Sequence, residues 1–113
     1  MTNKEITIAG KAVSVAYCYA TEIAFHKYTG KSVDEFDATD PDHVSYLIIS
    51  AILSYYQSRD EEPPVRDGDI MYDARPKEII NAMTAIFKLR AEWYEVPADE
   101  PKDEGKEPKR KND

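Results

Sequence analysis

Apolar and polar residues alternate near the start of the chain. Ile6 and Ile8 would share one face of a strand, and Val13 and Val15 would share one face of a second strand, on either side of a turn at Gly10. This period of two is typical of a half-buried β-hairpin. A lone two-stranded hairpin is only marginally stable in water, so we expect this one to pack on helices.

The spacing of apolar residues becomes helical after the hairpin. It predicts a helix over Tyr17–Tyr28, with Gly30 supplying a left-handed C-terminal cap. One stripe of this helix would face a neighbour, and its small alanines would allow a close approach. The stripe consists of Ala16, Tyr19, Ala20, Ile23, Ala24 and Lys27. Ser32 and Glu35 have capping-box spacing, which predicts one short helical turn anchored by Phe36.

A second helix is predicted to begin at Asp40 and Pro41 and to run to about Ser58. Asp40 can accept hydrogen bonds from free backbone amides, and Pro41 suits the first helical position because its missing N–H costs nothing there. Apolar residues cover most of the circumference. One stripe is Val44, Leu47, Ile48, Ala51 and Tyr55, and another is Ile49, Ile52, Leu53 and Tyr56. Such a helix is central to a fold or lies against a partner.

Pro63 and Pro64 prevent the helix from continuing, and the segment Ile70–Tyr72 reads as a short docking segment. Pro76 then opens a third predicted helix, about Lys77–Glu95. Its apolar or amphipathic positions recur at intervals of three and four. They are Ile79, Ile80, Met83, Ile86, Phe87, Arg90, Trp93 and Tyr94.

These elements predict an α+β fold, in which an N-terminal β-hairpin packs on a small bundle of about three main helices. A single domain would cover residues 1–96. Residues 97–113 contain no aromatic or branched aliphatic side chain, so they cannot bury enough apolar surface to offset the entropy of ordering. We expect them to form a disordered, charged, proline-containing tail.

The charge balance narrows the class of partner. The chain has 15 Lys and Arg against 22 Asp and Glu, a formal charge of −7. A nucleic-acid backbone requires a clustered basic surface, so we expect no nucleic-acid partner. No apolar run approaches the ~20 residues that span a bilayer, and the first residues lack the apolar stretch of a signal peptide. The single cysteine, Cys18, suits a reducing compartment, which predicts a cytoplasmic protein without a membrane partner.

Candidate chemistry is sparse. Cys18, Glu22 and His26 follow one another at intervals of one helical turn, which raises the hypothesis of a small metal-dependent enzyme, but a zinc site requires three or four converging ligands. His43 lies on another helix. The acidic run Asp34, Glu35, Asp37, Asp40 and Asp42 lacks the glycine of a calcium-binding EF-hand loop, so helix capping and solvation explain it better. We therefore expect no cofactor and no enzymatic activity.

Tyrosine is unusually frequent, with eight Tyr against three Phe and one Trp. Aromatic rings with a polar tip suit either the edge of a small core or a protein-binding surface. If the tyrosines form a protein-binding surface, we expect a groove between the second and third helices. Its contact residues would be Ile49, Leu53, Tyr56, Phe87, Trp93 and Tyr94, with Tyr17 and Tyr19 at the rim.

The hairpin, the following helix and the turn Thr29-Gly30-Lys31-Ser32 together resemble the opening of the tail assembly chaperones of long-tailed bacteriophages and prophages. The likeness in element order covers roughly residues 5–95. It implies a non-enzymatic assembly factor that shields apolar helical segments of a tape-measure protein and helps to deliver tail-tube subunits. It also implies that residues 97–113 lead into an extra domain in a longer, frameshifted product.

The negative net charge also allows an alternative to the chaperone function. An acidic helical protein can act as a nucleic-acid mimic, an inhibitor or adaptor that binds a regulatory protein through carboxylates spaced along one face. Its binding would fall steeply with added salt. Surplus apolar helix surface would also suit a homo-oligomer.

Overall fold

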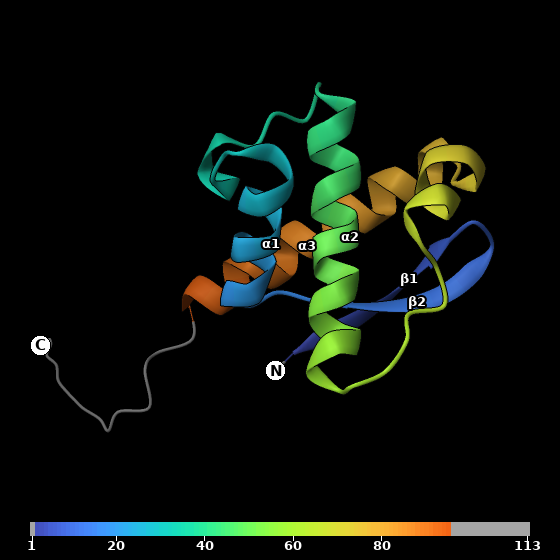
Figure 1. Cartoon of the computed structure of the whole chain (residues 1–113), viewed down its shortest axis with the longest axis horizontal. Coiled ribbons are helices and arrows are strands. Elements are labelled where there is room, and N and C mark those ends of the chain that lie inside the picture. The colour runs from blue at the N-terminus through green and yellow to red at the C-terminus, as the bar shows by residue number, and fades with distance from the viewer. Residues whose placement is uncertain (1, 96–113) are drawn as a thin grey trace, which may run out of the picture.

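The computed structural model describes residues 2–95 (Figure 1). The elements are β1 (Asn3–Ile8), β2 (Lys11–Ala16), α1 (Tyr19–Thr29), the short turn η1 (Val33–Glu35), α2 (Pro41–Ser58), the single turn η2 (Asp69–Asp73) and α3 (Pro76–Glu95). This order confirms the predicted α+β class, a hairpin on three main helices. The predicted tail, residues 97–113, lies outside the described residues.

The hairpin has the predicted register and burial. Strands β1 and β2 are antiparallel, and Ile6 lies opposite Val13. Ala9 and Gly10 form the two-residue loop, with φ of 54° and 76°, which is the left-handed pair that a tightly twisted hairpin turn requires. The apolar face of the hairpin packs against two helices, since β1 contacts α3 and β2 contacts α2.

The carboxylate of Glu78 ties the hairpin loop to α3. Its two oxygens accept hydrogen bonds from the backbone N–H groups of Ala9 and Gly10, each at 3.0 Å. A third bond comes from the Arg75 N–H at 2.9 Å, in the residue before α3 begins. The Arg75 N–H, followed by the Gly10 N–H, holds the pKa of this carboxyl below its usual range. One side chain therefore both caps a helix and fixes the hairpin over it.

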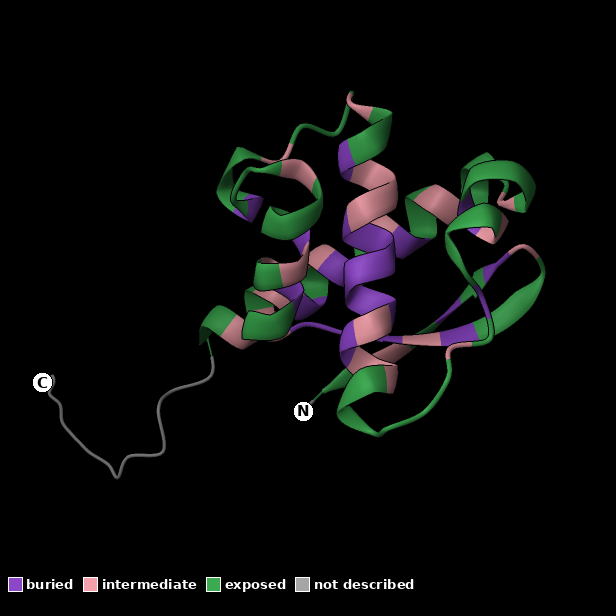
Figure 2. Ribbon diagram, viewed as in Figure 1, coloured by how far each residue is buried: buried purple, intermediate pink, exposed green. Residues whose placement is uncertain are grey.

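Helix α2 is the centre of the fold, as its apolar circumference predicted. It contacts α1 on one side, β2 on another and α3 on a third. Consecutive residues from Leu47 to Ile52 are buried, which Figure 2 shows as a continuous band around the middle of the helix. Asp40 caps the helix as expected by accepting the Asp42 N–H at 2.9 Å. Within residues 2–95, no helix is long and apolar enough to cross a membrane.

Helix α1 begins two residues later than predicted and buries a different face. The chain stays extended through Cys18, so the helix begins at Tyr19. Its buried residues are Thr21 and Phe25, whereas Tyr19 and Ile23 of the predicted stripe are exposed. The predicted stripe was wrong because it was chosen by counting apolar side chains. The helix instead buries Thr21, whose hydroxyl has hydrogen-bond partners in the core. Gly30 ends the helix with φ of 74°, as predicted.

One buried hydroxyl contact joins α1 to α2, and each of its two hydroxyls also bonds within its own helix or helix cap. The Thr21 and Ser54 hydroxyl oxygens lie 2.6 Å apart, and the Ser54 hydroxyl donates to the Ser50 carbonyl at 2.8 Å. The Thr21 hydroxyl oxygen in turn accepts the Cys18 N–H at 3.1 Å. Since Thr21 and Ser54 are buried, water cannot easily replace the contact between their hydroxyls if one of them is lost.

We expect Thr21→Val to lower the free energy of unfolding by about 1–3 kcal/mol, because it keeps the volume but leaves the Cys18 N–H without its acceptor and removes the hydroxyl contact with Ser54. Urea denaturation of Thr21→Val, Ser54→Ala and the double variant measures this. The double variant should lose less than the sum of the two single losses, since both changes remove one shared contact. Strict additivity would show that the hydroxyl pair carries no coupling energy.

We expect Glu78→Ala to lower the melting temperature at pH 7, because three backbone N–H groups lose their acceptor. The pKa of Glu78 is lower in the folded chain, so its stabilisation is present above the unfolded pKa of about 4.3 and is lost as the pH falls through the folded value. The difference from the wild type should therefore shrink below about pH 4. Glu62→Ala, which removes an exposed loop carboxylate, is the control, and an equal effect there would contradict the role of Glu78.

Candidate functional site

The eight residues predicted to bind a partner have different environments. Tyr17 and Ile49 are core residues with exposed fractions of 3% and 4%. Leu53, Tyr56, Phe87 and Trp93 are half-buried and pack against the core. Tyr19 and Tyr94 are exposed. The expectation that Tyr17 lies at a rim and Ile49 in an open groove was wrong, because α2 is covered on three sides and the buried Tyr17 ring packs against Trp93 of α3.

The structure brings Tyr17, Trp93 and Tyr94 together around Arg90. The rings of Tyr17 and Trp93 lie 5.5 Å apart, and those of Trp93 and Tyr94 lie 5.1 Å apart. The Arg90 guanidinium donates to the Tyr17 hydroxyl at 3.2 Å, to the Tyr94 hydroxyl at 3.2 Å and to Asp34 at 2.6 Å. This cluster joins the start of α1, η1 and the end of α3, so its tyrosines stabilise the fold.

Burial, followed by the hydrogen bond to Glu22, raises the pKa of Tyr17 far above its usual range. The Tyr17 hydroxyl donates to the Glu22 carboxylate at 2.9 Å, and this bond requires the neutral phenol. Partial burial acts to lower the pKa of Arg90, but its hydrogen bonds to Asp34 and Tyr17 raise it overall. The cluster therefore holds a neutral phenol beside a permanent cation.

The three residues of the hypothetical metal site have other partners or point to solvent. Glu22 accepts the Tyr17 hydroxyl and lies 3.7 Å from the Arg90 guanidinium. Cys18 precedes the first residue of α1, and His26 is exposed. Among the residues that the structure describes, no three His, Cys, Asp or Glu side chains are grouped so as to hold a metal ion.

The carboxylates of the acidic run mostly form hydrogen bonds within the fold. Asp34 accepts from Arg90, and Glu35 accepts the Ser32 N–H at 3.0 Å in the predicted capping box. Asp37 accepts from both the N–H and the hydroxyl of Thr39, which lowers the pKa of its carboxyl. Asp40 caps α2. Asp42 differs, since within residues 2–95 its carboxylate takes part in no hydrogen bond or ion pair.

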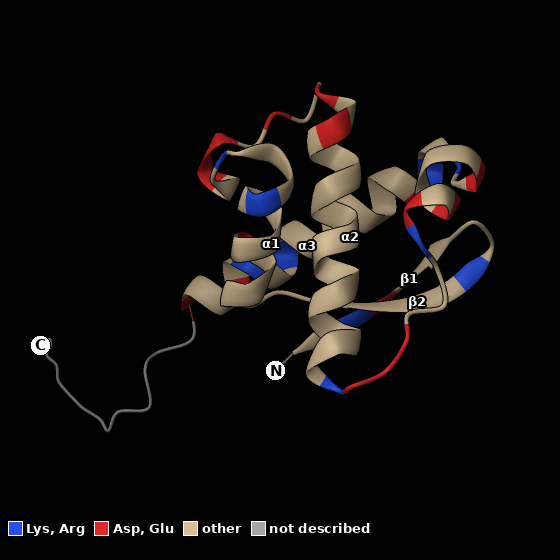
Figure 3. Cartoon of the chain, viewed as in Figure 1, with Lys and Arg blue, Asp and Glu red and all other residues tan. Residues whose placement is uncertain are grey.

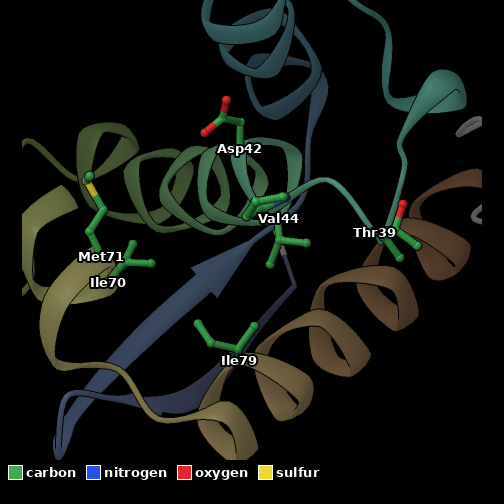
Figure 4. Close-up of a pocket in the computed structure, with 8 residues that line it drawn as sticks. Thr39, Asp42, Val44, Ile70, Met71 and Ile79 are labelled. Carbon is green, nitrogen blue, oxygen red and sulfur yellow. The ribbon is translucent and has the colours of Figure 1, made fainter.

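An open apolar hollow lies between the N-terminal halves of α2 and α3 and the turn η2 (Figure 4). Its volume is about 610 Å³, within the range of pockets that hold drug-sized ligands, so it can receive more than one side chain. The lining residues are Ala38, Thr39, Pro41, Asp42, Val44, Ile70, Met71 and Ile79. We call this space the α2–α3 hollow and treat it as the candidate binding site.

Side chains from three elements form the floor and one wall of the α2–α3 hollow. Val44 comes from α2, Ile79 from α3, and Ile70 and Met71 from η2, while Asp42 and Thr39 lie at its other edges (Figure 4). Ile70 is buried and anchors η2 to the core. The next residues turn outward, since the exposed fraction of Met71 is 64% and that of Tyr72 is 81%. The side chain of Met71 therefore stands at the mouth of the hollow.

The sequence indicated the parts of this site but not the site itself. It named Ile70–Tyr72 as a docking segment and placed Val44 and Ile79 on apolar stripes. Nothing in their spacing showed that the three would surround one space, because 24 residues lie between Val44 and the start of η2 at Asp69, and the last ten of these, residues 59–68, form a loop without apolar periodicity.

We expect Tyr17→Phe to lower the free energy of unfolding by about 1 kcal/mol at pH 7 through lost hydrogen bonds. Because the pKa of Tyr17 is raised by folding, its stabilisation is present below the unfolded pKa of about 10 and is lost as the pH rises above it. The wild type should therefore lose stability more steeply above pH 10 than Tyr17→Phe does, as urea denaturation can measure. Tyr19→Phe, at an exposed position, should follow the wild type; identical alkaline slopes for all three chains would refute the effect.

The turn that carries the family resemblance serves local structure here. The Thr29 hydroxyl donates to the Phe25 carbonyl and accepts the Lys31 N–H, and Gly30 provides the left-handed cap of α1. No binding role follows from these contacts, so the resemblance stays a prediction. Compared with protein-family models, curated proteins and solved structures, the chain matches none of them.

Proposed function

We propose that this chain is a non-enzymatic binding protein that covers an apolar helical segment of a larger protein, in the manner of a phage or prophage tail assembly chaperone. The observation that supports this most is the α2–α3 hollow. Val44, Ile70 and Ile79 line an open space, and Met71 is largely exposed at its mouth. Exposed apolar area of this kind costs free energy in the unbound chain, and a bound apolar segment would remove it from water.

The shape of the hollow favours a helix as the bound segment. Two helices and a helical turn form its walls, and an amphipathic helix buries one apolar face in such a groove through side chains spaced three and four residues apart. Under this proposal the partners are a tape-measure protein and tail-tube subunits in the cytoplasm.

The acidic-mimic hypothesis makes a different prediction about salt. No Lys or Arg lies between Lys31 and Arg59, so the end of the molecule around the start of α2 is acidic (Figure 3). Four of the five carboxylates there accept hydrogen bonds from other groups of the chain, which leaves few of them to imitate a row of phosphates. Binding by mimicry would weaken steeply with added salt, whereas apolar shielding would change little.

We expect co-expression of the full chain with the tape-measure protein of the same phage or prophage genome to keep that protein soluble, and the two to co-elute in gel filtration. Met71→Glu should reduce the soluble complex several-fold, because it places a charge in the apolar contact. Since Met71 is exposed, the variant should fold normally, as the melting temperature would show.

Two further variants make this experiment decisive. Gln57→Glu adds the same charge at an exposed position at the other end of α2 and should leave the complex intact. Tyr94→Glu tests the surface that the sequence had predicted. Loss of the complex with Tyr94→Glu but not with Met71→Glu would move the binding surface to the end of α3. Normal complexes with both variants would count against a binding role for either surface.

A further inference from the structure

One edge of the α2–α3 hollow is acidic, and this edge limits the chemistry of what the hollow can hold. Asp42 lines the hollow and stands in the first turn of α2. Asp40, which caps the same helix, has a side chain that is 42% exposed and lies 3.7 Å from the Nε2 of His43. The eight lining residues include neither Lys nor Arg. An occupant therefore meets apolar side chains and negative charge side by side.

Within the described residues 2–95, no Lys or Arg forms an ion pair with Asp42 or Asp40. The segment from Ser32 to Ser58, which contains the acidic edge, has no Lys or Arg at all. The opposite wall differs, because Lys11 lies 3.9 Å from Asp69 at the start of η2. Figure 3 shows this asymmetry, with only acidic colour at the start of α2 and both colours around η2. The negative charge around the hollow is therefore unevenly distributed. It is unpaired with Lys or Arg on the side of Asp42 and paired with Lys11 on the side of η2.

We infer that the bound segment is a basic amphipathic helix, in which Lys or Arg stands one helical turn from the aliphatic side chains that enter the α2–α3 hollow. The aliphatic side chains would contact Val44, Ile70 and Ile79, and the cation would lie beside the Asp42 carboxylate. This inference rests on the proposed function and specifies the chemistry of its partner. Charge complementarity of this kind selects among apolar partners and sets the orientation of the helix in the groove.

The probes are two synthetic 16-residue helical peptides with the same leucine stripe. One has Lys beside the stripe, and the other has Glu at the same positions. Each is titrated into the ¹⁵N-labelled full chain at low salt, and both the affinity and the shifted amide signals are recorded. We expect the Lys peptide to bind at least fivefold more tightly than the Glu peptide and to shift the signals of Val44, Met71 and Ile79.

The variant Asp42→Asn measures the contribution of the Asp42 negative charge to peptide binding. It should weaken binding of the Lys peptide by about two- to fivefold, the range for one exposed ion pair, and leave the Glu peptide unchanged or slightly improved. Glu62→Gln removes a carboxylate beyond the other end of α2 and should change neither affinity. Met71→Glu should weaken both peptides through the shared leucine contact.

The outcomes separate the two proposals. If both peptides shift the hollow residues with equal affinity, or if Asp42→Asn has no effect on the Lys peptide, the inference about charge is wrong and the hollow remains a docking site. If neither peptide shifts these residues, both the proposed function and the inference fail. If ultracentrifugation instead shows a dimer that Met71→Glu disrupts, a second copy of this chain occupies the hollow and the basic partner is overturned.

Discussion

The structure depends on burying α2 on three sides. Leu47, Ile48 and Ile52 are fully buried at its centre, and each contributes about 1.5–3 kcal/mol relative to exposure. A helix with apolar residues around most of its circumference requires several neighbours, and this small chain supplies them as α1, the hairpin and α3. The other elements therefore owe their positions to α2, and Ile49 is unavailable to any partner as a result.

Polar contacts then fix the covering elements in place. Glu78 holds the hairpin loop on α3, the Thr21–Ser54 pair fastens α1 to α2, and Arg90 joins α1, η1 and α3. Apolar contact is non-directional, so it brings these elements onto α2 without setting their orientation. The hydrogen-bonded groups at partly or fully buried positions supply that orientation, because each loses its partner if an element rotates.

The α2–α3 hollow follows from the way two helices meet. Figure 1 shows α3 passing behind α2 at a steep angle, so the two helices pack closely near their crossing and diverge on either side of it. The turn η2 closes one side of the resulting wedge with Ile70 but points Met71 outward. The hollow thus lies where the fold lacks a covering element, which is the property expected of a docking site.

Much of the fold follows from local patterns in the sequence. The alternation in the hairpin, the caps at Asp40 and Gly30, the capping box at Ser32 and the apolar circumference of α2 each predicted the observed element, because backbone geometry and short-range hydrogen bonds depend on neighbouring residues. Tertiary structure alone decided which face of α1 is buried, where the Tyr17 ring lies, and which apolar residues surround the hollow. These outcomes depend on hydrogen bonds such as Thr21–Ser54 and on the crossing of α2 and α3, which join residues far apart in the chain.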